Sequence, residues 1–143
     1  MEELGRILMQ FIYEGALWAE EAVAEEAVRW QISPAELKIL LFLCCAPGMD
    51  TAKDVAHYCG FSKASVSGNV LKLTTRGLLT VDMDLKDRRF QHLTLTEQAE
   101  PILSSIRRRL QEEYRRVLLP LSETEREQLW SLLKRVRFGR RDR

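Results

Sequence analysis

The chain has 143 residues, of which 45% are hydrophobic, so it suits a single domain with one buried core. It has no run of eighteen apolar residues, and its N-terminus carries glutamates where a secretory signal would carry basic residues. These features argue against a membrane span and a signal peptide, and we expect a cytoplasmic protein without a membrane partner.

The net charge of +1 is unevenly divided along the chain. Residues 1–50 carry three Lys/Arg against nine Asp/Glu, residues 51–92 carry seven against four, and residues 93–143 carry twelve against eight. Contacts between cations and phosphates dominate the affinity of proteins for DNA. The pattern therefore favours residues 51–92 as a DNA-contacting unit, with the acidic first segment kept away from the duplex.

Residues 2–29 are predicted to form one long helix, because apolar residues recur there at helical spacing. This apolar stripe consists of Leu4, Leu8, Phe11, Ile12, Trp18 and Ala22. A second helix is predicted after Ser33, which would cap it, with Pro34 at its first position and an end near residues 46–48. Its expected core residues are Leu37, Leu40, Leu41 and Cys44.

Two short helices separated by a tight turn are predicted next, over residues 52–58 and from residue 63 to about residue 76. Thr51 and Asp54 have the spacing of a capping box, which pairs backbone N–H groups that a helix leaves free. Gly60 favours the turn, because glycine adopts a positive φ without steric cost. This order is typical of a helix-turn-helix.

The second of these helices, bounded by Ser62 and Gly77, has an apolar and a polar side. The residues expected to be buried are Val66, Val70 and Leu73. The outer side carries Lys63, Ser65, Ser67, Asn69 and Lys72. Such groups suit a helix in a major groove, where hydroxyls and amides read base edges and lysines meet phosphates. A solvated polar face is the alternative interpretation.

A hairpin is predicted from two β-compatible runs, residues 78–83 and 90–95, on either side of a polar segment. Its tip carries three cations that can reach a neighbouring minor groove, namely Lys86, Arg88 and Arg89. Asp87 is expected to orient an arginine of the tip through a charge-assisted hydrogen bond. A charged tip that only keeps the hairpin soluble is the alternative.

Residues 97–143 are predicted to form two further helices. Pro101 predicts either an irregular first turn or a start near Glu100, and Ser122 with Glu125 forms another capping box. The helices of the first and last thirds carry more apolar surface than a compact winged core can cover. We therefore expect a homodimer whose recognition helices lie about 34 to 36 Å apart along the duplex. Packing of the stripes within one chain is the alternative.

Four segments occur in a familiar order: Ser65-Val66-Ser67, the step from Leu73 to Gly77-Leu78-Leu79, Asp87-Arg88-Arg89, and Leu93-Thr94-Leu95-Thr96. Together they resemble the MarR family of bacterial and archaeal transcription regulators, and the resemblance covers nearly the whole chain. It implies an obligate homodimer that binds a pseudo-palindromic operator in double-stranded DNA. It also implies release by a small phenolic or lipophilic ligand or by thiol oxidation, as is frequent in that family.

The expected fold is mainly α (α+β), a winged helix-turn-helix with long N- and C-terminal dimerisation helices in one domain over residues 1–143. Residues 1–31 and 97–143 would form the dimerisation helices. Residues 32–96 would form the winged helix-turn-helix, with the helix-turn-helix at 51–76 and the wing at 78–95.

The chain departs from the family pattern at three positions. Members often carry a long polar residue where Gly68 stands, and one or two arginines near Val81 and Asp82. These departures leave the strength of phosphate anchoring and the operator sequence open. They also keep an alternative function open, a winged-helix protein-interaction module without operator specificity.

Four aromatic residues are the candidates for lining an effector pocket, although aromatic residues at helical spacing also occur as plain core: Phe11, Tyr13, Trp18 and Trp30. Cys44, Cys45 and Cys59 lack metal-ligand spacing, and neighbouring cysteines rarely pair. Thiol-sensing relatives carry the reactive cysteine on the first helix, which has none here. We therefore expect inert, buried cysteines and no metal.

The two histidines, His57 and His92, have no nucleophile or carboxylate placed beside them by local spacing, so we expect neither an enzyme nor a cofactor. His57 is expected to contact a phosphate or to be a partly buried helix residue. The last residues form a basic tail that can touch DNA nonspecifically, namely Arg135, Arg137, Arg140, Arg141 and Arg143.

The sequence thus predicts a homodimeric repressor. The residues expected at base edges are Lys63, Ser65, Ser67 and Asn69. Those expected at phosphates are Ser62, Lys72, Lys86 and Arg88, and Arg89 is expected in the minor groove.

Overall fold

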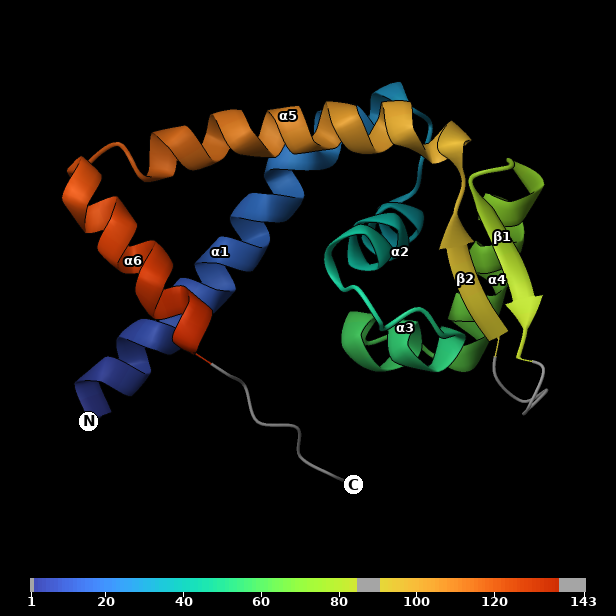
Figure 1. The fold of residues 1–143 in the computed structure, drawn as a ribbon, viewed down its shortest axis with the longest axis horizontal. Helices are drawn as coiled ribbons and strands as arrows, with labels where there is room; N and C mark the ends of the chain where they lie inside the picture. The colour runs from blue at the N-terminus through green and yellow to red at the C-terminus, as the bar shows by residue number, and fades with distance from the viewer. Residues whose placement is uncertain (1, 85–90, 137–143) are drawn as a thin grey trace. The chain divides into compact units, whose positions relative to one another are not determined.

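The computed structural model describes residues 2–84 and 91–136 of the chain, which divides into two compact units, Met1–Leu110 and Gln111–Arg143. The elements in order are α1 (Glu2–Arg29), α2 (Pro34–Cys45), α3 (Ala52–Cys59), α4 (Lys63–Thr75), β1 (Leu79–Met83), β2 (Gln91–Leu95), a 3₁₀ turn (Glu97–Ala99), α5 (Glu100–Val117) and α6 (Glu123–Arg135) (Figure 1). This order of helices with one small antiparallel sheet confirms the predicted mainly α winged-helix fold.

The first two helices begin and end close to the predicted residues. A left-handed residue, Gln31 (φ 52°), turns the chain after α1, and Ser33 forms a capping box with the buried Glu36. The end of α1 is also held by the side chain of Arg76, which donates hydrogen bonds to the carbonyl oxygens of Gln31 (2.7 Å) and Trp30 (2.8 Å). The C-terminus of α1 is therefore tied to the residue that follows α4.

The predicted core residues of α2 are only partly right. Leu37 and Leu40 are buried, whereas Leu41 and Cys44 are half-buried and pack at the margin of the core. Ile39, which the spacing did not select, is fully buried. Almost every residue of α2 is apolar, so its sequence does not distinguish an inner face from an outer one.

The helix-turn-helix forms as predicted. Thr51 and Asp54 make the capping box of α3, and Gly60 ends that helix with φ 71°. Ser62 caps α4 by accepting a hydrogen bond from the backbone N–H of Ser65 (3.1 Å), and Gly77 (φ 71°) follows the helix. α3 and α4 pack against each other, and β1 packs against α4.

β1 begins one residue later than predicted and ends at Met83 as predicted, and β2 is described from Gln91 to its predicted end at Leu95. Leu78 is buried just before β1, and Phe90 lies outside the described residues. In the register, Val81 lies opposite Leu93 and Asp82 opposite His92. The backbone N–H of Leu93 also donates to the carbonyl of Asp50 (2.7 Å), so the segment before α3 joins the edge of β2.

Pro101 is accommodated at the second position of α5, where no intrahelical hydrogen bond to its nitrogen is needed. Both predicted outcomes occur, because a 3₁₀ turn precedes a helix that begins at Glu100. In the second unit, Ser122 and Glu125 form the predicted capping box of α6. Across the described part of the chain, the helices are too short or too polar to cross a membrane.

Candidate nucleic-acid interface

The helix α4 lies between the core and solvent. Val66, Val70 and Leu73 are buried as predicted, which leaves the opposite side of the helix exposed. On that outer side Ser62, Lys63, Ser67 and Lys72 are exposed, whereas Ser65 and Asn69 are half-buried. The six predicted contact residues of this helix therefore surround one exposed face, and four of them are open to solvent.

Two of these side chains bind to each other rather than pointing freely outward. The Asn69 amide nitrogen donates to the carbonyl oxygen of Ser65 (2.8 Å) and lies 3.4 Å from its hydroxyl. A side chain that bonds to the preceding turn of its own helix has its donors directed away from a partner. Lys63 and Lys72 form no ion pair within residues 2–84 and 91–136, so both ammonium groups are available to an anion.

The base of the wing is held by a histidine between two carboxylates. The Nδ1 atom of His92 lies 3.0 Å from Oδ1 of Asp50, and its Nε2 atom lies 3.2 Å from Oδ2 of Asp84. The hydrogen bond to Asp50, followed by that to Asp84, raises the pKa of His92. The segment before α3, the end of β1 and the start of β2 are thereby joined at one imidazole.

This cluster was not predicted from the sequence, because Asp50 stands 42 positions away from His92 in the chain. The pairing of two strands and a third edge segment brings these residues together, and local spacing carries no signal of it. The residues predicted for the wing tip, Lys86, Asp87, Arg88 and Arg89, lie outside the described residues.

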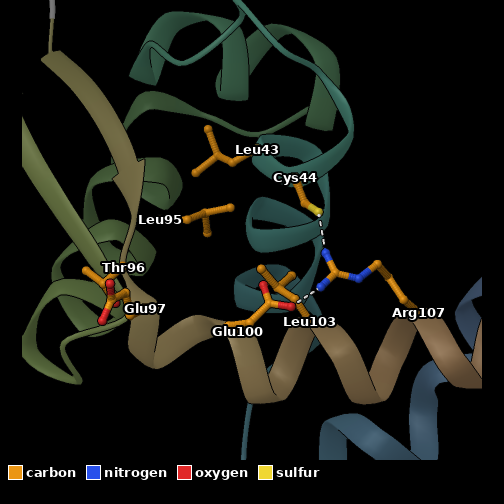
Figure 2. Close-up of a pocket in the computed structure, with 8 residues that line it drawn as sticks. All are labelled: Leu43, Cys44, Leu95, Thr96, Glu97, Glu100, Leu103 and Arg107. Carbon is orange, nitrogen blue, oxygen red and sulfur yellow. Dashed lines mark hydrogen bonds and ion pairs between the residues drawn. The ribbon is translucent and has the colours of Figure 1, made fainter.

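A pocket of about 610 Å³ lies where α2 ends, β2 ends and α5 begins (Figure 2). Its lining residues are Leu43, Cys44, Leu95, Thr96, Glu97, Glu100, Leu103 and Arg107. The guanidinium of Arg107 donates to Sγ of Cys44 (3.4 Å) and to the carboxylate of Glu100. The pocket thus combines leucine side chains with one cation that is shared between a thiol and a carboxylate.

Comparison with known proteins identifies the segment that contains this helix-turn-helix. The family model described as the MarR family matches residues 30–89. This segment is therefore similar in sequence to the MarR family. No curated protein matches the sequence.

Solved structures, two of them described as MarR proteins, share the fold of nearly the whole chain. A MarR family protein from Bacillus stearothermophilus has 18% identity and a TM-score of 0.73, covering 94% of each chain. A MarR transcriptional regulator from Methanosarcina mazei Go1 has 17% identity and a TM-score of 0.67, covering 94% of this chain and 93% of its own. CouR from Rhodococcus jostii RHA1, solved with bound p-coumaroyl-CoA, has 21% identity and a TM-score of 0.64, covering 90% and 89%.

The four aromatic residues predicted to line an effector pocket are not brought to the pocket of Figure 2. Phe11 and Tyr13 are exposed on α1, and Trp18 and Trp30 are half-buried, with Trp30 packed against the core. Their role toward a ligand remains a prediction.

The expectation of buried cysteines is right only for Cys59. Cys44 is half-buried and Cys45 is exposed, because the apolar helix α2 leaves the core at its C-terminal end. Burial raises the pKa of the Cys59 thiol, and partial burial, followed by the charge of Cys44, raises that of Cys45. Among the described residues no group of His, Cys, Asp and Glu is arranged to hold a metal ion.

His57 is exposed, so the expectation that it is partly buried is wrong. Its ring meets that of Tyr58 edge-on, with 4.9 Å between the ring centroids. A phosphate contact from His57 remains a prediction.

Proposed function

We propose that this MarR-family chain is a sequence-specific DNA-binding regulator that acts as a homodimeric repressor on a pseudo-palindromic operator. The observation that carries the proposal is the exposed face of α4, which presents Lys63, Ser67 and Lys72 beside a hairpin fixed at its base. A helix so presented fits a major groove, while the hairpin flanks it.

The contacts divide between bases and phosphates. Lys63 and Ser67, with Ser65 and Asn69 beside them, approach base edges from the first turns of α4. Ser62 and Lys72 contact phosphates, which position the helix without reading sequence. The sequence-based assignment of Lys86 and Arg88 to phosphates and of Arg89 to the minor groove completes the proposed interface.

Exposed apolar side chains support the dimer. In the first unit α1 buries only Ala22, Val23 and Ala27, and its earlier turns expose Leu4, Leu8 and Phe11. In the second unit α6 has no buried residue and exposes Trp130, Leu132 and Leu133. Soluble monomers rarely expose apolar patches of this extent, so we assign both surfaces to a second copy of the chain.

The pocket of Figure 2 is the proposed place for an effector of the phenolic or lipophilic class. Leu43, Leu95 and Leu103 provide apolar contact, and Arg107 provides a cation for a polar group of the ligand. CouR, which shares the fold, binds p-coumaroyl-CoA, and this supports a search within that chemical class. Because the pocket joins α2, β2 and α5, occupation of it would change how the wing is held.

Selection of genomic fragments by the purified protein tests the proposed function. A regulator enriches one palindromic site, whereas a winged-helix interaction module enriches nothing or all fragments equally. The variant Lys63→Ala should lose the enrichment. Its matched control, Lys38→Ala, removes an exposed cation from α2, outside α4 and the proposed dimer surfaces, and should retain it. Uniform recovery of fragments by the wild-type protein would refute the proposal.

A further inference from the structure

The centre of the exposed face of α4 is apolar. At 100° per residue, the buried residues Val66, Val70 and Leu73 define the inner side of the helix. Ala64, Gly68 and Leu71 fall on the opposite side and are all exposed, Leu71 by 67%. We call these three residues the apolar strip.

The polar residues predicted to read bases lie beside the apolar strip rather than on it. Ser65 and Asn69 lie along one side, where the Asn69 amide is bonded to Ser65. Ser67 lies along the other side. At the C-terminal end of the helix the same side also carries Thr75, whose hydroxyl donates to the carbonyl oxygen of Leu71 (2.8 Å). From Ala64 to Leu71, however, this side offers no hydrogen-bonding side chain to a base edge, and a partner there contacts methyl and methylene groups.

The apolar strip also has a gap in its middle. A Cβ atom placed at Gly68 would have no neighbouring atom within 4 Å, so the space over this residue is open. Ala64 stands four residues before Gly68, and the longer Leu71 stands three residues after it. A small apolar group that projects toward the helix would fit over Gly68 and touch both neighbours.

The C5-methyl group of thymine is such a group. It is the one apolar feature of the base edges in the major groove, and proteins recognise it by contact with apolar side chains. Lys63 lies beside one end of the strip and Lys72 beside the other, and neither is ion-paired within the described residues. The charge of Lys72 is thus placed for a phosphate beside an apolar contact, and Lys63 is placed for a base edge beside its other end.

We propose that α4 reads thymine through the C5-methyl group, with Gly68 providing the gap and Ala64 and Leu71 the contacts. This inference rests on the proposed function, because it assumes that α4 enters a major groove. It adds a chemical feature by which α4 selects thymine, because hydrogen bonds from the flanking residues do not detect a methyl group.

The test compares thymine with deoxyuridine, which lacks only the methyl group. The duplex recovered by fragment selection is prepared with thymine or with deoxyuridine in each half-site, and its affinity is measured at fixed salt. We expect the substitution to weaken binding about fourfold for each methyl contact, the factor equivalent to ~0.8 kcal/mol. The variant Leu71→Ala should bind more weakly and distinguish the two duplexes less.

The controls separate this inference from the proposed function. Leu119→Ala removes a leucine that is also exposed but lies outside the strip, and it should retain the full preference for thymine. Equal binding of both duplexes by the wild-type protein, or an unchanged preference in Leu71→Ala, would overturn the inference while operator binding stood. Failure to enrich any site would instead overturn the proposed function, and this inference with it.

Discussion

The imidazole of His92 and the carboxylate of Asp50, 42 positions apart in the sequence, lie within hydrogen-bond distance at the base of the wing. Asp84 engages the other ring nitrogen. A neutral imidazole has one N–H group and can donate to only one of these carboxylates, whereas an imidazolium ion donates to both. The attachment of β2 to its two neighbours therefore depends on the protonation of one side chain.

The first prediction concerns pH. The pKa of His92 is raised in the folded protein, so protonated His92 stabilises the fold. This stabilisation is fully present below the ordinary histidine pKa, and it is lost as the pH rises through the raised pKa of the folded protein. We expect operator affinity to decline over that range, and an NMR titration of the imidazole should give the same midpoint.

The variant His92→Gln, which cannot titrate, should bind with little dependence on pH over the same range. His57→Gln is measured beside it, because His57 is exposed and outside the wing and its predicted phosphate contact would add a pH dependence of its own. The midpoint that belongs to His92 should remain in that variant. A midpoint for His92 at or below the ordinary value would contradict the geometry of this cluster.

The second prediction separates stability from binding at Gly68. Alanine is preferred over glycine inside a helix by about 1 kcal/mol, and the space at Gly68 is open. Gly68→Ala should therefore raise the free energy of unfolding by up to that amount in a denaturant titration. It should also reduce operator affinity, because the added methyl group fills the gap proposed for thymine.

Gly77→Ala is the contrasting variant. Gly77 has φ 71°, and a Cβ atom there would collide with the side-chain amide of Gln98. We expect this substitution to lower the free energy of unfolding. If both alanine variants had the same effect on stability, the local geometry assigned to these two glycines would be wrong.

The third prediction concerns Lys72. If its ammonium group neutralises a phosphate, Lys72→Ala should weaken binding to all duplexes alike, specific and nonspecific. The slope of log affinity against log salt concentration should fall by about one for each half-site. A change in the preferred sequence, with the salt slope unaltered, would assign Lys72 to a base edge instead.

The fourth prediction concerns the apolar surface of α1. Phe11 is 64% exposed in the single chain, so Phe11→Glu should leave the fold of the chain intact. A charge placed within an apolar dimer contact is costly to bury, and the variant should sediment as a monomer with much weaker operator binding. Gln10→Glu adds the same charge at a neighbouring polar position of α1 and should remain dimeric.

Local signals made the secondary structure predictable. Each of Ser33, Thr51, Ser62 and Ser122 caps a helix at the expected residue, because a cap depends only on residues three positions apart. The turn at Gly60 follows from the same local chemistry. These positions sufficed to place the helix-turn-helix and the residues on its outer side.

Features that depend on tertiary packing were not predictable. The cluster around His92 forms only when two strands and a third segment pair in the observed register. Whether Ile39 is buried depends on which side of a mostly apolar helix packs against the core. The hydrogen bond from the Asn69 amide to the previous turn of α4 was also not predicted. Sequence patterns identify which residues share a face, but not which of them are already engaged by neighbours.

Arg76 couples the end of α1 to the end of α4. Its planar guanidinium donates hydrogen bonds to two consecutive carbonyl oxygens, those of Trp30 and Gln31, and a lysine ammonium would not make both bonds in the same fixed geometry. A tilt at the C-terminus of α1 would therefore be transmitted to the C-terminus of α4. In the proposed dimer, the distance between the two copies of α4 would therefore depend on the orientation of the two copies of α1.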